Sequence, residues 1–109
     1  MRQVKIGKKE YTIKLSYNAQ KAWQEETGRK FEELDETVEP DELISLIWYG
    51  LKSGAIIDGV ELDISRDEIN EYLGIADVSR ITALLFSDMA KSIEDANSEI
   101  KKNNLVKKG

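Results

Sequence analysis

The sequence contains no cysteine and no histidine, and it has one proline among its 109 residues. Without cysteine, a disulfide framework and a thiolate metal site are excluded. Without histidine, the chain lacks the most common general base, the most common zinc ligand and the usual pH switch. The functions open to this chain are therefore those that need neither thiol nor imidazole chemistry.

Long apolar runs are also missing. No run approaches the ~20 residues that a membrane-spanning helix needs, and no signal-peptide core follows Met1. We therefore expect no membrane partner and a place in the cytoplasm. The length fits one domain, and a chain of this size can bury roughly 65% of its unfolded surface, enough to fold without cross-links.

The net charge is −5, although its sign changes along the chain. A general nucleic-acid binder needs clustered lysine and arginine to contact phosphates, so we expect no nucleic-acid partner. Residues 1–15 and the segment after Ile100 are basic, whereas residues 23–42 are mostly acidic. Ordinary solvated faces explain this distribution, and head-to-tail self-association between the basic end and the acidic belt is the alternative.

The most informative stretch predicts a helix over residues 40–53. Pro40 suits the first helical position, and Asp41 and Glu42 lie where the helix dipole favours negative charge. Gly54 is placed to end the helix in a left-handed cap. Apolar residues cover more than one face of this helix: Leu43, Ile44, Leu46, Ile47, Trp48 and Leu51. Such a helix must be buried from several sides, so we expect it to be central.

The remaining elements follow from periodicity and caps. Alternating apolar residues on either side of GKKE predict a β-hairpin over residues 3–15, whose apolar face must pack on helices. Asp58-Gly59 between apolar residues is a two-residue hairpin signal, and the short flanking segments predict either an excursion of the chain or a second, very small hairpin. Ser16 is expected to cap a helix over residues 17–27, and Ser65 with Glu68 forms a capping box that begins a helix over 65–73. A last helix is expected over 77–100, followed by a flexible basic tail over 101–109 without periodicity. The predicted fold is one domain over residues 1–100, of class α+β and mainly α, with the N-terminal hairpin packed on a bundle of about four helices.

The sequence offers no constellation for catalysis. Carboxylates that could act as acid and base occur as neighbouring pairs, at Glu25-Glu26, Glu32-Glu33 and Asp67-Glu68. All lie in polar helix-surface contexts, whereas a catalytic carboxyl needs burial or a close like charge to shift its pKa. No nucleophile elbow, phosphate-cradling glycine loop or EF-hand spacing occurs. We therefore expect no enzymatic activity, no cofactor and no metal.

Several apolar residues are candidates for contact with a partner. Tyr49 lies beside Trp48 on a helix that is already apolar on most sides, and the sequence leaves core and interface open for it. The apolar stripe of the last helix continues beyond what a small domain needs, and its distal half either packs internally or seats another subunit or peptide. The predicted contact residues are Trp48, Tyr49, Leu51, Ile93 and Ile100.

Four segments together resemble the tail assembly chaperones of long-tailed, siphovirus-like bacteriophages. They lie within residues 4–75 and read VKIGKKEYTIKLS, the helix ending in EETGR, DELISLIWYGLKSG, and DGVELDISRDEINEYL. The final helix fits this family but is generic. The matching features are patterns of spacing, not catalytic signatures.

The resemblance implies a mainly helical, self-associating protein that binds the tape measure protein, keeps it soluble and helps to recruit tail tube subunits. Such a protein acts in the host cytoplasm and is absent from the mature virion. Many members also have a longer form made by a −1 ribosomal frameshift, and the codons of Lys107-Lys108-Gly109 can form a slippery run. Two other functions remain open: a structural tail or head–tail component retained in the particle, and a small acidic regulatory protein that acts through its interactions, including nucleic acid bound by the basic hairpin face.

Overall fold

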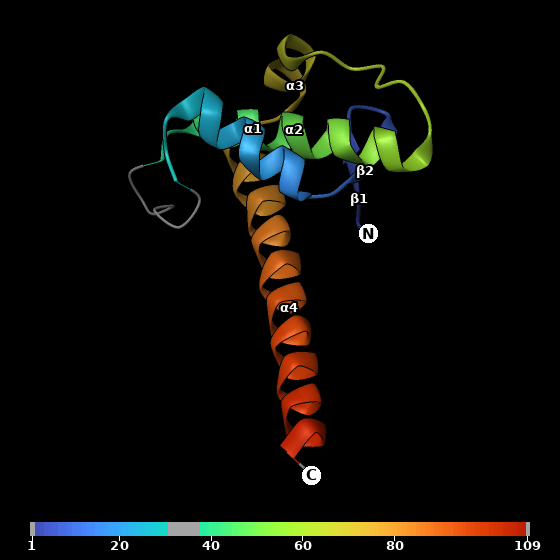
Figure 1. The fold of residues 1–109 in the computed structure, drawn as a ribbon. Helices are drawn as coiled ribbons and strands as arrows, with labels where there is room; N and C mark the ends of the chain where they lie inside the picture. Colours follow the sequence, from blue (N-terminus) through green and yellow to red (C-terminus); the bar gives the residue numbers. More distant parts are fainter. Residues whose placement is uncertain (1, 31–37, 109) are drawn as a thin grey trace.

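The computed structural model describes residues 2–30 and 38–108, with side chains up to residue 91 (Figure 1). The elements are β1 (Arg2–Ile6), β2 (Lys9–Ile13), α1 (Tyr17–Thr27), α2 (Pro40–Asp58), α3 (Arg66–Tyr72) and α4 (Ile75–Lys108). The two strands form an antiparallel hairpin that packs against the helices. The predicted mainly helical α+β fold with an N-terminal hairpin is confirmed.

The hairpin has one buried face, as its alternation predicted. Val4 pairs with Tyr11 across the ladder, and the connection turns at Gly7, whose φ of 65° lies in the left-handed region. Val4, Ile6 and Ile13 are buried, while the lysines of both strands are exposed. An isolated two-stranded hairpin is marginal in water, so this buried face is what stabilises it.

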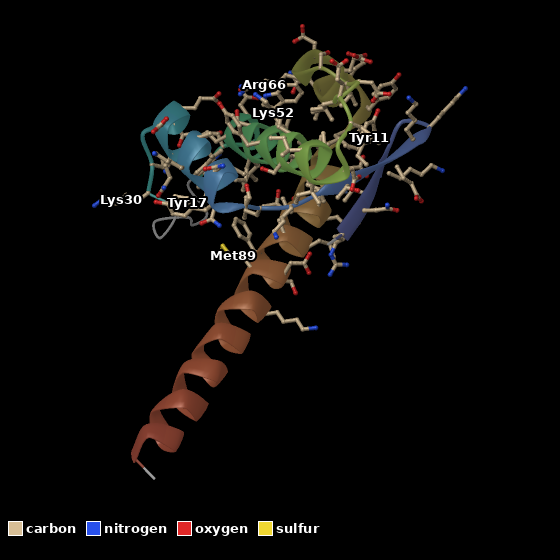
Figure 2. All side chains as sticks on the ribbon, turned by 45° about the vertical axis from the view of Figure 1, so that its right-hand side comes forward. Tyr11, Tyr17, Lys30, Lys52, Arg66 and Met89 are labelled. Carbon is tan, nitrogen blue, oxygen red and sulfur yellow. The ribbon has the colours of Figure 1, made fainter. Side chains whose placement is uncertain are left out.

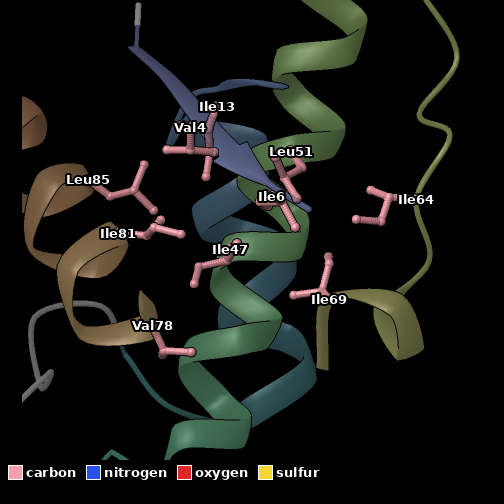
Figure 3. Packing of buried hydrophobic residues seen from close by; sticks show 10 residues of the cluster. All are labelled: Val4, Ile6, Ile13, Ile47, Leu51, Ile64, Ile69, Val78, Ile81 and Leu85. Carbon is pink, nitrogen blue, oxygen red and sulfur yellow. The ribbon is translucent and has the colours of Figure 1, made fainter. Parts of the chain in front are cut away.

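Helix α2 is the centre of the molecule. Pro40 occupies its first turn, and the side chains of Glu39 and Glu42 form a reciprocal capping box with the backbone. Leu46 and Ile47 are fully buried. Figure 3 shows side chains of the hairpin, of α4 and of the segment around α3 converging on α2; this core cluster comprises Val4, Ile6, Ile13, Ile47, Leu51, Ile64, Ile69, Val78, Ile81 and Leu85. The prediction of a central helix is confirmed.

The predicted end of this helix at Gly54 is wrong, because α2 continues to Asp58. Gly59, with a φ of 69°, supplies the left-handed cap, and its N–H donates to the carbonyl oxygens of Ala55 and Ile56. The small hairpin predicted at Asp58-Gly59 is therefore wrong too. These two residues are the last residue of α2 and its cap.

A glycine is needed at position 54, inside α2, because β2 passes directly over this residue. A Cβ atom at Gly54 would lie 1.8 Å from the carbonyl oxygen of Thr12, closer than any two such atoms can approach. One turn earlier, the carbonyl oxygen of Gly50 accepts a hydrogen bond from the Lys14 N–H at 3.1 Å. The two glycines therefore allow the strand backbone to contact the helix backbone.

Helix α3 agrees with the predicted range of 65–73 to within one residue at each end. The Ser65 hydroxyl accepts a hydrogen bond from the Glu68 N–H at 3.2 Å, and the Glu68 carboxylate accepts one from the Ser65 N–H at 3.2 Å. This is the capping box that the sequence indicated. Ile69 is buried and anchors the short helix to the core.

Helix α4 is longer at both ends than the predicted range of 77–100. It begins at Ile75 and continues to Lys108, so the expected flexible tail is helical through Lys108. No glycine or proline occurs between these two residues, so nothing in the sequence stops the helix once it has begun. Figure 1 shows α4 leaving the globule and projecting away from it, and the longest dimension of the molecule is 57 Å against 33 and 24 Å.

Candidate partner-binding surface

An open groove lies where α4 leaves the globule. Its volume is about 1330 Å³, and its walls come from both strands, the segment leading into α1, the first turn of α1, the end of α2 and about two turns of α4. Figure 2 shows Tyr17 and Met89 on the side from which α4 emerges. The apolar residues that line the groove are Ile13, Leu15, Tyr17, Leu85 and Met89.

The depth of these residues gives the groove a floor and an exposed edge. Ile13 and Leu85 belong to the buried core and form the floor, whereas Leu15 and Met89 are half-buried. Tyr17 stands at the edge with 79% of its surface exposed. An exposed aromatic side chain beside half-buried aliphatic ones is typical of a surface that another molecule covers.

The exposed position of Tyr17 follows from the way α1 begins. Ser16 caps the helix, because its Oγ accepts a hydrogen bond from the Ala19 N–H at 3.1 Å. The Ser16 and Ser53 hydroxyls also share a hydrogen bond of 2.7 Å, which anchors the start of α1 on α2. As Ala19 and Trp23 form the buried stripe of α1, Tyr17 lies off that stripe and faces outward.

The charged residues of the groove are unevenly paired. Arg2 donates from Nε and Nη2 to the two carboxylate oxygens of Asp88 at 2.8 and 2.7 Å, which ties β1 to α4. These hydrogen bonds hold the pKa of Asp88 below its usual value, and the nearby charge of Lys91 adds to the effect. Asp58 accepts a hydrogen bond from the Thr12 hydroxyl at 2.5 Å. Both carboxylates of the groove are therefore already bonded.

Two lysines of the groove have no such partner. Lys14, which follows β2, and Lys91, on α4, are exposed, and neither forms a salt bridge within the part of the chain that the structure describes. The groove thus carries an excess of positive charge on a molecule whose net charge is −5.

Two of the predicted contact residues, Trp48 and Tyr49, lie together beneath two cations. The Arg66 guanidinium carbon is 5.8 Å from the Trp48 ring centroid and 5.3 Å from that of Tyr49. The Lys52 ammonium lies 5.7 and 5.8 Å from the same two centroids. Cations at such distances are attracted to the ring faces. Both rings are half-buried, so they are neither wholly core nor freely exposed.

Glu26 joins this aromatic pair to α1. Its carboxylate accepts hydrogen bonds from the Tyr49 hydroxyl at 2.9 Å and from the guanidinium of Arg66. The bonds from Arg66 lower the pKa of Glu26 to about 2, outweighing the opposite effect of partial burial. Burial and the bond to Glu26 raise the pKa of Tyr49. This network connects α1, α2 and α3 and has the character of a structural ion pair, not of an acid–base site.

Of the other three predicted contact residues, one is buried and two have side chains outside the described residues. Leu51 has no exposed surface, because α2 turns this side chain toward the hairpin, and its prediction as a contact residue is wrong. The side chains of Ile93 and Ile100 lie outside the described residues, as do residues 31–37 of the acidic belt. Partner contact at Trp48 and Tyr49 stays a prediction.

Sequence reasoning missed several exposed apolar side chains. Ile56 and Ile57 are exposed in the last turn of α2, the former at 78%, and Val60 is exposed just after the helix cap. The sequence pattern does not indicate them, because Asp58-Gly59 predicts a turn after Gly54 and not the end of a longer helix. Tyr17 gave a signal that could have been used: it follows a capping serine and lies outside the buried stripe of its helix.

A second, smaller pocket of about 250 Å³ lies between β2 and the segment after α2. Lys9 donates to the Asp63 carboxylate at its rim, and burial beside this carboxylate raises the pKa of Tyr11 to about 12. Among the residues that the structure describes, no cluster of three or more potential metal ligands occurs. Nor is any helix in the described part long and apolar enough to cross a membrane.

Comparison with known proteins adds no relative from which a role could be transferred. The sequence matches no protein-family model, no curated protein sequence and no solved structure at a significant level.

Proposed function

We propose that this protein is a tail assembly chaperone of a long-tailed bacteriophage, which binds the tape measure protein and keeps it soluble. It acts as an oligomer in the host cytoplasm, helps to recruit tail tube subunits and leaves before the virion is complete. The observation that carries the proposal is the projecting helix α4 beside an apolar groove. Two independent supports follow, one from the surface and one from the sequence.

The first support is the surface that α4 provides. A protein that shields long apolar helices needs an apolar surface on a rigid helical support, and recognition of a helix in a groove requires no reaction chemistry. Leu85 and Met89 line the groove, and the helix continues from there beyond the globule. A partner helix lying along α4 would contact the groove and the projecting helix together.

The second support is the resemblance to tail assembly chaperones, which covers residues 4–75. That range runs from β1 to the start of α4, so it includes the hairpin, α2 and α3 but almost none of the projecting helix. The resemblance and the surface on α4 are therefore separate observations that favour the same function.

Coexpression with the tape measure protein encoded by the same phage tests the proposal. We expect the tape measure protein to be soluble with the wild-type chain and largely insoluble without it. Met89→Glu should abolish this effect by placing a charge in the groove. Ile75→Glu, at a residue that is 76% exposed and does not line the groove, is the matched control and should retain it. An insoluble tape measure protein in the presence of the folded wild-type chain would contradict the proposal.

Mass spectrometry of purified particles separates the proposal from its structural alternative. A chaperone that leaves before completion should be absent from the particle, whereas a stoichiometric presence would assign the protein as a tail or head–tail component. Expression from the native downstream DNA with an N-terminal tag adds a second readout. A longer product in the −1 frame would support the chaperone assignment.

A further inference from the structure

The groove beside α4 differs in charge from the molecule as a whole. Its two carboxylates, Asp58 and Asp88, are bonded to Thr12 and Arg2. The ammonium groups of Lys14 and Lys91 remain without a salt bridge among the described residues, although the charge of Lys91 acts on Asp88. A ligand that enters the groove therefore meets the exposed ammonium groups of Lys14 and Lys91, whereas both carboxylates already accept hydrogen bonds from the protein.

The shape of the groove favours a helix as its ligand. One wall is a helix that runs past the groove, and the apolar positions along it, from Met89 to Ile93, Ala96 and Ile100, are four, three and four residues apart in the sequence. This spacing is that of a coiled-coil seam, which packs against another helix. The volume of about 1330 Å³ exceeds that of an ordinary small-molecule pocket, roughly 300–1,000 Å³.

We infer that this groove binds an amphipathic helix whose aliphatic stripe is flanked by aspartate or glutamate residues. The aliphatic side chains of the bound helix pack on Leu15, Leu85 and Met89 and against the ring of Tyr17. The carboxylates that flank them on the bound helix pair with Lys14 and Lys91. The inference rests on the proposed function in one respect: if the protein binds the tape measure protein, the acid-flanked helix is the segment of that protein that enters the groove.

The charge at the end of α4 argues against residues 101–108 of a second copy as the occupant. Residues 92–108 carry four lysines against three carboxylates, and the lysines are grouped in the last eight residues. A second α4 seated with residues 101–108 in the groove would bring lysines toward Lys14 and Lys91, where like charges repel, whereas residues 92–100 of a second copy carry Glu94, Asp95 and Glu99 and no lysine. An acid-flanked helix from another protein has no such penalty.

Binding of two synthetic peptides to the full-length protein tests the inference. Both are about three heptads long with leucine at the a and d positions, and they carry glutamate or lysine at the flanking e and g positions. Isothermal titration calorimetry should show the acidic peptide binding at least about tenfold more tightly than the basic one. The double variant Lys14→Glu/Lys91→Glu should reverse this preference, whereas Lys8→Glu, at the distant hairpin turn, should leave it unchanged.

Truncation of the exposed aromatic residue provides a second, charge-independent test. Tyr17→Ala should weaken binding of the acidic peptide about tenfold, because an edge of the groove is lost. Ile75→Ala removes an apolar side chain of similar exposure outside the groove and should have no effect. Circular dichroism of each variant establishes that it is folded before it is titrated.

Three results would overturn the inference: equal affinity for the two peptides, binding of neither, or binding that survives both Tyr17→Ala and the double charge reversal. Displacement of the acidic peptide by a short single-stranded DNA would assign the lysines to phosphate and would also overturn it. The outcome is separable from the proposed function. A chaperone that binds its partner through another face would still solubilise the tape measure protein while failing the peptide test.

Discussion

Helices α2 and α4 are the two long helices of this protein, and they depend on their surroundings to different degrees. In α2, Leu46, Ile47 and Leu51 are fully buried, and Gly50 and Gly54 admit the backbone of β2. In α4, the buried residues Val78, Ile81 and Leu85 all lie in the first third, and the helix then leaves the globule. The conformation of α2 is thus set by tertiary packing, whereas the backbone of the distal part of α4 projects beyond the globule.

This difference predicts that stability and the proposed partner binding depend on different parts of the chain. A change in the middle of α2 alters contacts with the hairpin, α1 and α4 at once. In Figure 1 the backbone of the distal part of α4 extends away from the hairpin and from the other helices. Stability should therefore respond to substitutions in α2, and partner binding to substitutions in the exposed part of α4.

The largest effect is expected at Gly54. Gly54→Ala places a methyl group 1.8 Å from the Thr12 carbonyl oxygen, so β2 must separate from α2. We expect a loss of about 5 kcal/mol in the free energy of unfolding, measured by urea denaturation, or no cooperative transition at all. Gly59→Ala is the matched control. It should lower the free energy of unfolding by only about 1 kcal/mol, the strain of a left-handed alanine, because no atom lies within 4 Å of the added carbon. Equal losses for the two variants would contradict the close contact.

The next largest effect is expected at Leu51, which the sequence placed on a contact surface and the structure places in the core. Leu51→Ala should lower the free energy of unfolding by about 3 kcal/mol, because it leaves a cavity between α2 and the hairpin. Thermal denaturation followed by circular dichroism measures this loss. An unchanged melting temperature combined with lost partner binding would contradict the core position of Leu51 and support its prediction as a contact residue.

A smaller effect is expected at the ion pair between Glu26 and Arg66. The pKa of Glu26 is lowered from 4.5 to about 2, so its contribution to stability is complete above pH 4.5 and disappears as the pH falls toward 2. Because the pair is partly exposed and screened by solvent, we expect about 1 kcal/mol. Glu26→Gln should remove this part of the pH dependence, measured as the difference between the two unfolding curves across that range. Parallel curves would show that the pair contributes nothing.

The smallest effect on the globule is expected from a proline in the distal part of α4. Ala96→Pro should leave the cooperative melting temperature unchanged while reducing the helical signal at 222 nm, because it interrupts the helix in the part whose backbone projects away from the globule. Ala83→Pro, at an exposed position within the packed part of the same helix, should cost about 3 kcal/mol. A similar loss of stability for both variants would show that the distal turns pack on the globule.

Much of the fold could be predicted from the sequence because its signals are local. The alternation around GKKE, the capping residues Ser16 and Ser65 and the apolar circumference of α2 all correspond to elements in the structure. Each of these signals reflects a requirement that residues within a few positions of one another satisfy. Distant parts of the chain are not needed to interpret them.

The errors arose where one residue type serves two purposes. Glycine either ends a helix in a left-handed conformation or lets another backbone approach, and the local sequence does not distinguish Gly54 from Gly59. Likewise, an all-round apolar helix does not show which face meets the hairpin, so Leu51 was placed on the wrong side. The absence of periodicity after Ile100 predicts a flexible tail, although α4 continues to Lys108 and no glycine or proline interrupts it before that residue.

The groove could not be predicted at all. Arg2 and Asp88, which meet across it, are 86 positions apart, and Lys14 and Tyr17 come from a third part of the chain. No local pattern connects these residues, because only the folded arrangement of β1, α1 and α4 brings them together. A charge excess that forms in this way is invisible to counts along the sequence.

The contact between Gly54 and Thr12 also has a consequence for amide hydrogen exchange. Since the hairpin would be marginal on its own and one of its strands lies on the backbone of α2, the strand cannot separate without exposing the face of the helix that it covers. Amides of the hairpin and of the middle of α2 should therefore exchange through one common opening. The distal amides of α4 should exchange through separate local openings, so that the helix proposed to contact a partner can rearrange while the globule stays closed.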